Sequence, residues 1–276
     1  MQILGVGALN KMHTKLDEVV SYQLQLSDSV INMNALLGKK IQIRSLSEIC
    51  CIHCGRKTKK SFSQGYCYPC FSKLPQCDSC IMSPEKCHFQ QGSCRDPLWG
   101  EQHCFVPHIV YLANSSGVKV GITRATQVPT RWMDQGAIEA LPIFSVKTRQ
   151  QSGLIERVYG EHISDRTNWR AMLKGDVDSL DLEAIRNQLY EQCQQGVSDL
   201  QTEHGLQSIV PLFDSEKIKI NYPVLKYPTK VVSHNLDKTP QIDGVLLGIK
   251  GQYLILDTGV INLRKYTAYQ AEFSAE

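Results

Sequence analysis

Residues 51–70, CIHCGRKTKKSFSQGYCYPC, contain two Cys-x2-Cys pairs, Cys51 with Cys54 and Cys67 with Cys70. Each pair makes a tight turn that can aim two sulfur atoms at one ion, and two such turns supply the four thiolates of a tetrahedral zinc site. Four protein ligands leave no position for a substrate, so we expect a structural zinc ion here. Its binding free energy would stabilise a segment in which apolar runs are few.

A second set of cysteines follows directly along the chain. We favour Cys77, Cys80, Cys87 and Cys94 as the ligands of a second zinc ion, because one Cys-x2-Cys pair and two later cysteines complete a tetrahedral site. One position of this set stays open, since a later cysteine or a histidine could replace one of the four: Cys104, His88, His103 or His108. Cys50 lies one residue too early, and we expect it to bind no metal.

The distribution of cysteines also bears on the class of protein. Ten of the eleven cysteines fall between Cys50 and Cys104. A disulfide framework suits a small secreted chain, whereas this chain has 276 residues and begins without an apolar export signal. We therefore expect a soluble, cytoplasmic protein, with no membrane partner because no apolar run approaches the roughly 18 residues of a spanning helix. The net charge of +3 permits a polyanionic partner without requiring one.

Hydrophobic patterning predicts an α+β protein. Alternating apolar residues indicate strands near both ends of the chain, and helical spacing of apolar residues occurs between them. In chain order, the predicted segments are a β-rich segment, the cysteine-rich zinc-binding segment, a core with helices and a β-rich C-terminal segment: 1–49, 50–104, 105–205 and 206–276. The first and the last of these could pair in one discontinuous β-unit.

Two triplets in the core segment, Ile109-Val110-Tyr111 and Lys119-Val120-Gly121, lie on predicted strands around an Asn-Ser-Ser-Gly turn. Arg131, Glu156 and Asn168 follow them. This order and spacing resembles the GIY-YIG endonuclease superfamily, in a bacterial branch with an N-terminal zinc-binding cysteine-rich segment. The resemblance covers about a quarter of the chain, from residue 109 to about residue 174. It implies a small mixed sheet with flanking helices.

The resemblance also implies a chemistry, which is metal-dependent hydrolysis of a phosphodiester. This reaction needs an activated water and cations that stabilise charged oxygens. Tyr111 could orient or deprotonate the water if its pKa is lowered by cations such as Lys119. Arg131 could hold the phosphate, and Glu156 could bind Mg²⁺ or Mn²⁺, with Asn168 as a further site residue. Lys119 stands where the nuclease pattern has tyrosine, which departs from the usual two-tyrosine arrangement.

We therefore predict a zinc-containing protein that binds DNA or RNA and hydrolyses phosphodiesters in this core. The alternative is a non-catalytic module that keeps the fold and binds nucleic acid or a protein, with Lys119 marking lost cleavage. A redox protein is a third class, but no Cys-x2-Cys pair opens a helix after a strand, as thioredoxin-like chemistry requires. The basic run 56–60, between the first two cysteine pairs, is either a phosphate-binding loop or a solvated turn.

Overall fold

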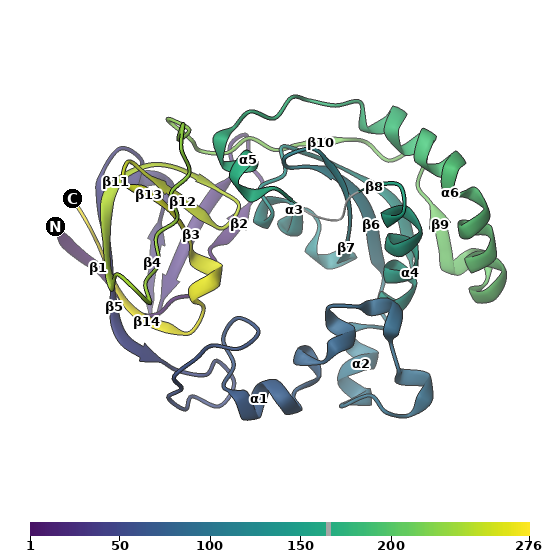
Figure 1. Cartoon of the computed structure of the whole chain (residues 1–276), viewed down its shortest axis with the longest axis horizontal. Helices are drawn as coiled ribbons and strands as arrows, with labels where there is room; N and C mark the ends of the chain where they lie inside the picture. Colours follow the sequence, from purple (N-terminus) through teal and green to yellow (C-terminus); the bar gives the residue numbers. More distant parts are fainter. Residues whose placement is uncertain (164–166) are drawn as a thin grey trace.

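The structure is a computed structural model that describes residues 1–163 and 167–276. It contains three β-sheets with helices, which confirms the predicted α+β class (Figure 1). Within the described residues, no helix is both long and apolar enough to cross a membrane. The helices and strands, in chain order, are β1 (Gln2–Ala8), β2 (His13–Lys15), β3 (Ser21–Leu26), β4 (Ser29–Asn32), β5 (Lys40–Ile49), α1 (Tyr68–Lys73), α2 (Pro97–His103), β6 (His108–Asn114), β7 (Val118–Arg124), α3 (Thr130–Asp134), β8 (Glu139–Val146), α4 (Arg149–Gly160), α5 (Trp169–Lys174), α6 (Leu182–His204), β9 (Ile209–Pro211), β10 (Ile218–Lys219), β11 (Gln241–Lys250), β12 (Tyr253–Leu256), β13 (Gly259–Asn262) and β14 (Tyr269–Ala275).

The two ends of the chain form one six-stranded antiparallel sheet, in the order β1-β14-β5-β11-β12-β13. Alternate residues of its strands face the interior, and Ile43 of β5 and Phe273 of β14 have no exposed surface. The three-stranded sheet of β2, β3 and β4 adds Tyr22 and Leu24 to the same apolar cluster. Both termini therefore lie on the same side of the molecule, beside each other in Figure 1.

The core segment forms a five-stranded sheet in the order β10-β8-β6-β7, with β9 also paired to β8. A tight turn joins β6 to β7, and Gly117 within it has a φ of +120°, which glycine adopts without steric cost. We predicted a mixed sheet, but every described pair of neighbouring strands in it is antiparallel. β6 lies between β7 and β8 and is antiparallel to both, so these two strands run in the same direction without being neighbours. β7 is left at an edge of the sheet.

This sheet is covered on both faces. On one face, Val110 and Leu112 of β6 pack with residues of α4 and α6, such as Ile155. On the opposite face, Tyr111 packs with Trp132 of α3 in a cluster that also contains residues of the terminal sheets. Because one apolar cluster spans both units, the five-stranded sheet and the terminal β-unit are packed directly against each other.

The cysteine-rich segment is built differently. Residues 50–104 form the short helices α1 and α2, joined by four 3-10 helices between residues 75 and 91. Among the described residues, no member of this segment belongs to any of the three hydrophobic core clusters. The segment connects β5 of the terminal sheet to β6 of the core, along the lower side of Figure 1. A segment without an apolar core needs another source of stability.

Candidate functional site

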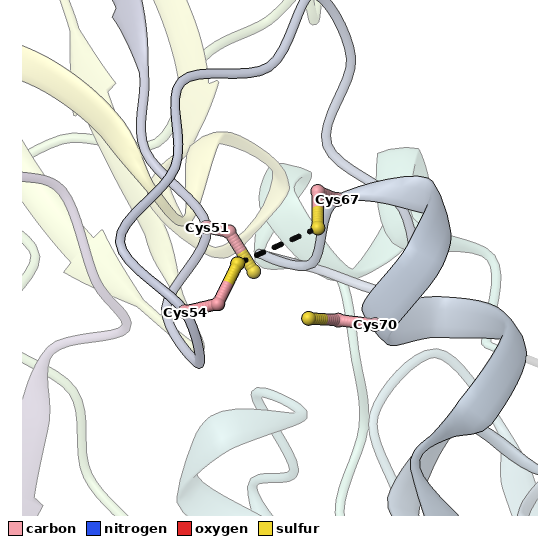
Figure 2. Close-up of side chains that lie close together, drawn as sticks. All are labelled: Cys51, Cys54, Cys67 and Cys70. Carbon is pink, nitrogen blue, oxygen red and sulfur yellow. Dashed lines mark hydrogen bonds between the residues drawn. The ribbon is translucent and has the colours of Figure 1, made fainter.

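The first predicted set of metal ligands converges on one point. The Sγ atoms of Cys51, Cys54, Cys67 and Cys70 all lie within 4.8 Å of one another, and Figure 2 shows the four side chains pointing inward. The Sγ atoms of Cys54 and Cys67 are 3.7 Å apart. When metal–sulfur bonds are about 2.3 Å long, the edge of a sulfur tetrahedron is about 3.8 Å. The four cysteines can therefore hold a metal ion in tetrahedral geometry.

Two backbone turns aim these sulfur atoms. In the first turn, the backbone N–H of Gly55 donates to the carbonyl oxygen of Cys51, and Gly55 has a φ of +71°. Glycine accepts this left-handed conformation easily, so the turn can stay tight. In the second turn, Cys67 is the residue before α1 and Cys70 lies in the first turn of that helix. Pro69 favours this helix start, because a first helical turn has no intrahelical partner for its N–H groups.

The four thiols differ in acidity. Burial raises the pKa of Cys51, but the backbone N–H groups of Cys54, Cys67 and His53 outweigh burial and bring that pKa down to about 6. At Cys70, burial and contacts with the other three thiols raise the pKa to about 12. The four groups therefore cannot all ionise at neutral pH by themselves, because each new thiolate is repelled by those already present. A bound cation removes this repulsion.

The second predicted set does not assemble as we expected. Cys80, Cys87 and Cys94 line one small cavity together with Cys104, and Cys77 is not among the described residues of that lining. Cys77 and Cys80 lie in different 3-10 helices, separated by one extended residue. They therefore do not form the tight turn of the first two pairs. Three of the ligands that we favour line this cavity, together with two of the open alternatives, Cys104 and His88.

The predicted core residues line a larger cavity at the edge strand β7. Tyr111, Lys119, Arg131 and Glu156 all contribute to the wall of this cavity, whose volume is about 550 Å³. They come from four different elements, β6, β7, α3 and α4. The structure therefore brings together four of the five residues that we predicted for the core site.

This cavity, which we call the β7 cavity, is electropositive. Six cationic side chains and two carboxylates line it: Lys11, Lys119, Arg124, Arg131, Arg149 and Arg264, with Asp134 and Glu156. Asp134 already forms an ion pair of 2.8 Å with Lys11. Burial lowers the pKa of Arg149, and repulsion from Arg124 and Arg131 lowers it further. Cations crowded in this way favour the binding of an anion.

The pKa of Tyr111 is raised, whereas a role as catalytic base requires it to be lowered. Tyr111 is fully buried, and burial raises its pKa to about 12, although the nearby charge of Arg131 lowers it. Its hydroxyl donates to Oε1 of Gln135 at 3.0 Å. Our condition for Tyr111 acting as a base, a lowered pKa, is therefore not met. Protonated at neutral pH and donating its O–H to Gln135, Tyr111 can orient a water molecule by accepting a hydrogen bond through its oxygen.

A glycine on the neighbouring strand makes room for this tyrosine. Gly121 pairs directly with Tyr111 across β6 and β7, and a Cβ atom on Gly121 would lie 2.8 Å from the Tyr111 hydroxyl oxygen. Only glycine therefore lets the ring lie across β7. Trp132 holds the ring on another side, at 5.7 Å between ring centroids, and is itself fully buried.

Asn168 takes no part in the β7 cavity. It is exposed and caps the N-terminus of α5, where its Oδ1 accepts a hydrogen bond of 3.2 Å from the backbone N–H of Ala171. Its own N–H donates to Oγ of Ser116 at 2.9 Å. The side chain stabilises the start of a helix, which is a common role for asparagine.

Three arginines of the β7 cavity were not identified from the sequence. Arg124 ends β7 and Arg149 begins α4, so the predicted strand and helix could have located both. Arg264 lies beyond β13, and only the tertiary structure brings it to the cavity. Its Nε donates to Oε1 of Gln64 at 2.7 Å, on the loop between the first two cysteine pairs. The loop between the first two cysteine pairs is therefore in contact with a residue of the cavity wall.

A family model with the description "Protein of unknown function (DUF2797)" matches residues 38–271. The chain belongs to the DUF2797 family. No curated protein and no solved structure matches the chain. The range matched by DUF2797 includes both sets of cysteines and all the charged residues of the described cavity wall except Lys11.

Replacement of Cys51 by serine should remove about one metal ion per chain, because three thiolates and a hydroxyl bind a soft divalent ion more weakly than four thiolates. Elemental analysis of protein purified without chelator measures this directly. Cys50→Ser is the matched control, since Cys50 is adjacent in sequence and lies outside the tetrad. Equal metal content in Cys51→Ser and wild type would rule out the tetrad as a metal site.

Proposed function

We propose that this protein binds nucleic acid, DNA or RNA, in the β7 cavity and hydrolyses a phosphodiester there with Mg²⁺ or Mn²⁺. The observation that carries the proposal is the convergence of Tyr111, Lys119, Arg131 and Glu156 on one electropositive cavity. Its volume of about 550 Å³ is in the range that holds a small organic ligand, so it suits a nucleotide unit with its phosphates. The core then acts as a member of the GIY-YIG superfamily, which its two triplets resemble.

Each of these residues has a role that fits its surroundings. Arg131 grips the phosphate through its planar, bidentate guanidinium group, at the helix start where the superfamily pattern expects an arginine. Glu156 is half-buried and offers hard carboxylate oxygens, the ligands that Mg²⁺ prefers. Such an ion supplies a Lewis acid for the phosphate oxygens. Tyr111, protonated, orients the attacking water by hydrogen bonding.

Lys119 replaces the tyrosine of the nuclease pattern. It is 5% exposed and lies on β7 opposite Ala113, on the same face of the sheet as Tyr111. A cation in this position stabilises negative charge that develops on the phosphate, which a tyrosine hydroxyl does less strongly. With lysine in place of tyrosine, an ammonium group instead of a hydroxyl stabilises the negative charge on the phosphate.

We further propose that the metal held by the Cys51 tetrad is zinc in a structural role. Four thiolates in tetrahedral geometry are typical of zinc, and they leave no position for substrate. Iron also binds four cysteines, so elemental analysis that finds iron in place of zinc would contradict this assignment. Thiols must stay reduced to bind zinc, which favours the cytoplasm as the location of the protein.

A second candidate function is a non-catalytic module that binds nucleic acid or a protein. It is favoured by one observation, the raised pKa of Tyr111, which removes the simplest route to an ionised base. The cations of the β7 cavity would bind a polyanion equally well without cleavage. The two functions differ in the role of Glu156, because only hydrolysis needs its carboxylate.

Glu156→Gln should lower metal-dependent cleavage by at least about 100-fold, since the loss of a metal ligand removes several kcal/mol of transition-state stabilisation. Single-stranded, duplex and branched DNA and RNA, each with Mg²⁺ and with Mn²⁺, form the substrate panel. Glu161→Gln is the matched control, because Glu161 follows α4 and is exposed. The pH profile should show no loss of activity from Tyr111 below about pH 10, because its pKa lies near 12.

Two results decide between the candidate functions. Cleavage by wild type that Glu156→Gln abolishes supports hydrolysis. If wild type cleaves nothing in the panel and Glu156→Gln binds nucleic acid as wild type does, the protein is a binding module.

The salt dependence of binding should identify the surface that contacts phosphate. Arg131→Ala combined with Arg124→Ala should reduce the slope of log affinity against log salt by about 0.9 per phosphate contact for duplex DNA, and by about 0.7 for a single strand. The control variant neutralises the exposed run Arg56, Lys57, Lys59 and Lys60, in which Lys57 already pairs with Glu48 at 2.6 Å. If the slope changes in the control variant and stays constant in the cavity variant, the phosphates contact the basic run and not the β7 cavity.

A further inference from the structure

The small cavity in the cysteine-rich segment has the size and lining of a metal site. Cys80, Cys87, Cys94 and Cys104 all line it, and its volume is about 20 Å³. A single water molecule needs a cavity of roughly 10–15 Å³ on the same measure. The cavity therefore has room for one ion and excludes an organic ligand. We call it the thiol cavity.

All four cysteines are partly buried where they line this cavity. They reach it from separate turns of the segment, and Cys104 lies at the end of α2. Four cysteine side chains that line one cavity of this size can share a cation.

Aromatic side chains supply part of the apolar lining of the thiol cavity. Phe89 and Phe105 both line it, and their ring centroids are 4.5 Å apart. Trp99 lines it as well and stacks on His103 at 4.2 Å. An apolar shell of this kind lowers the local dielectric and strengthens metal–thiolate bonds.

We propose that Cys80, Cys87, Cys94 and Cys104 bind a second zinc ion, and that this ion fixes the wall of the β7 cavity. The set differs from an ordinary pair of Cys-x2-Cys turns, because its ligands are spaced along 25 residues with two 3-10 helices and α2 between them. The turns between Cys80 and Cys104 contribute no described residue to a hydrophobic core cluster. Four metal–thiolate bonds would therefore hold them together.

A competing ligand set exists beside the thiol cavity. Ligand atoms of Asp78, Cys80 and His88 lie within 4.8 Å of one another. The Asp78 carboxylate is already engaged, since Oδ1 accepts a hydrogen bond of 2.6 Å from the N–H of Ser79 and Oδ2 pairs with Nε of Arg95 at 3.1 Å. A guanidinium at that distance repels a divalent ion.

His88 is engaged as well. Its Nδ1 lies 2.9 Å from Oγ of Ser93, and its Nε2 lies 3.4 Å from Oδ2 of Asp78. Both ring nitrogens thus have protein partners, and binding a metal would break one of these contacts. Asp78 thus lies within ion-pair distance of both His88 and Arg95, and this cluster supports the turns around the thiol cavity.

The proposed zinc ion is coupled to the β7 cavity through α4. The chain between Cys80 and Cys87 contains Ile81, Met82 and Pro84, which line the β7 cavity. The carbonyl oxygen of Ile81 accepts a hydrogen bond of 2.7 Å from Nη2 of Arg149. Metal ligands at both ends of this short stretch would hold it rigidly beside the phosphate-binding cations.

Two further contacts lead to the same helix. The carbonyl oxygen of Cys104 accepts a hydrogen bond of 2.7 Å from the backbone N–H of Arg149, the first residue of α4. A Cβ atom on Gly153 of α4 would lie 2.7 Å from Cβ of Pro84, so this turn and the helix are in direct contact. Since α4 also carries Glu156, the second zinc ion would position both Arg149 and Glu156.

Metal content tests the ligand set without any use of nuclease activity. Wild-type protein purified without chelator should contain two zinc ions per chain, and Cys104→Ser and Cys87→Ser should each contain one. Cys77→Ser and His88→Ala are the matched controls and should keep two, because neither residue is a ligand in this proposal. One zinc ion in the wild type, two in Cys104→Ser, or one in His88→Ala would each overturn the proposal.

X-ray absorption spectroscopy of the wild type identifies the zinc ligands even if a cysteine variant fails to fold. With eight thiolate ligands for two zinc ions, the spectrum should fit sulfur alone at about 2.3 Å. Nitrogen or oxygen ligands at about 2.0–2.2 Å would instead indicate the Asp78, Cys80 and His88 set, and would overturn the proposal. Neither result depends on whether the β7 cavity cleaves nucleic acid.

Discussion

Repulsion among crowded thiols is the constraint on which the rest of this structure depends. Cys51, Cys54, Cys67 and Cys70 lie within 4.8 Å of one another, and they can all ionise only if they share a cation. Their segment, residues 50–104, contributes no described residue to a hydrophobic core cluster. Metal–thiolate bonds would therefore supply the stability that apolar burial supplies elsewhere in the protein.

The cysteine-rich segment matters for function because it forms part of the β7 cavity. Gln64, between the first two cysteine pairs, accepts a hydrogen bond from Arg264, and residues 81–84 add to the wall beside Arg149. The terminal β-unit contributes Lys11 and the five-stranded sheet contributes Tyr111. All three units thus shape a cavity that holds several cations close together. Burial lowers the pKa of Arg149, and repulsion from Arg124 and Arg131 lowers it further. An anion that binds here would relieve that repulsion.

Local rules in the sequence predicted part of this arrangement. The hairpin of β6 and β7 follows from alternation around a short turn, and the first cysteine tetrad follows from two Cys-x2-Cys pairs. Features that depend on distant packing were harder to predict. Cys104 lines the thiol cavity and Cys77 does not because of the path of several 3-10 helices, and the raised pKa of Tyr111 depends on its complete burial. Arg264 is brought to the cavity from the C-terminal segment, which no local pattern indicates.

Hydrogen exchange of the backbone amides, with and without a zinc chelator, tests most directly whether metal binding organises the cysteine-rich segment and the cavity wall. Removal of the metal should increase exchange throughout residues 50–104 and in the first turn of α4, where the N–H of Arg149 bonds to Cys104. The paired strands β5 and β14, which have an apolar core of their own, should keep their protection. Unchanged protection of residues 50–104 in metal-free protein would contradict the dependence of this segment on metal.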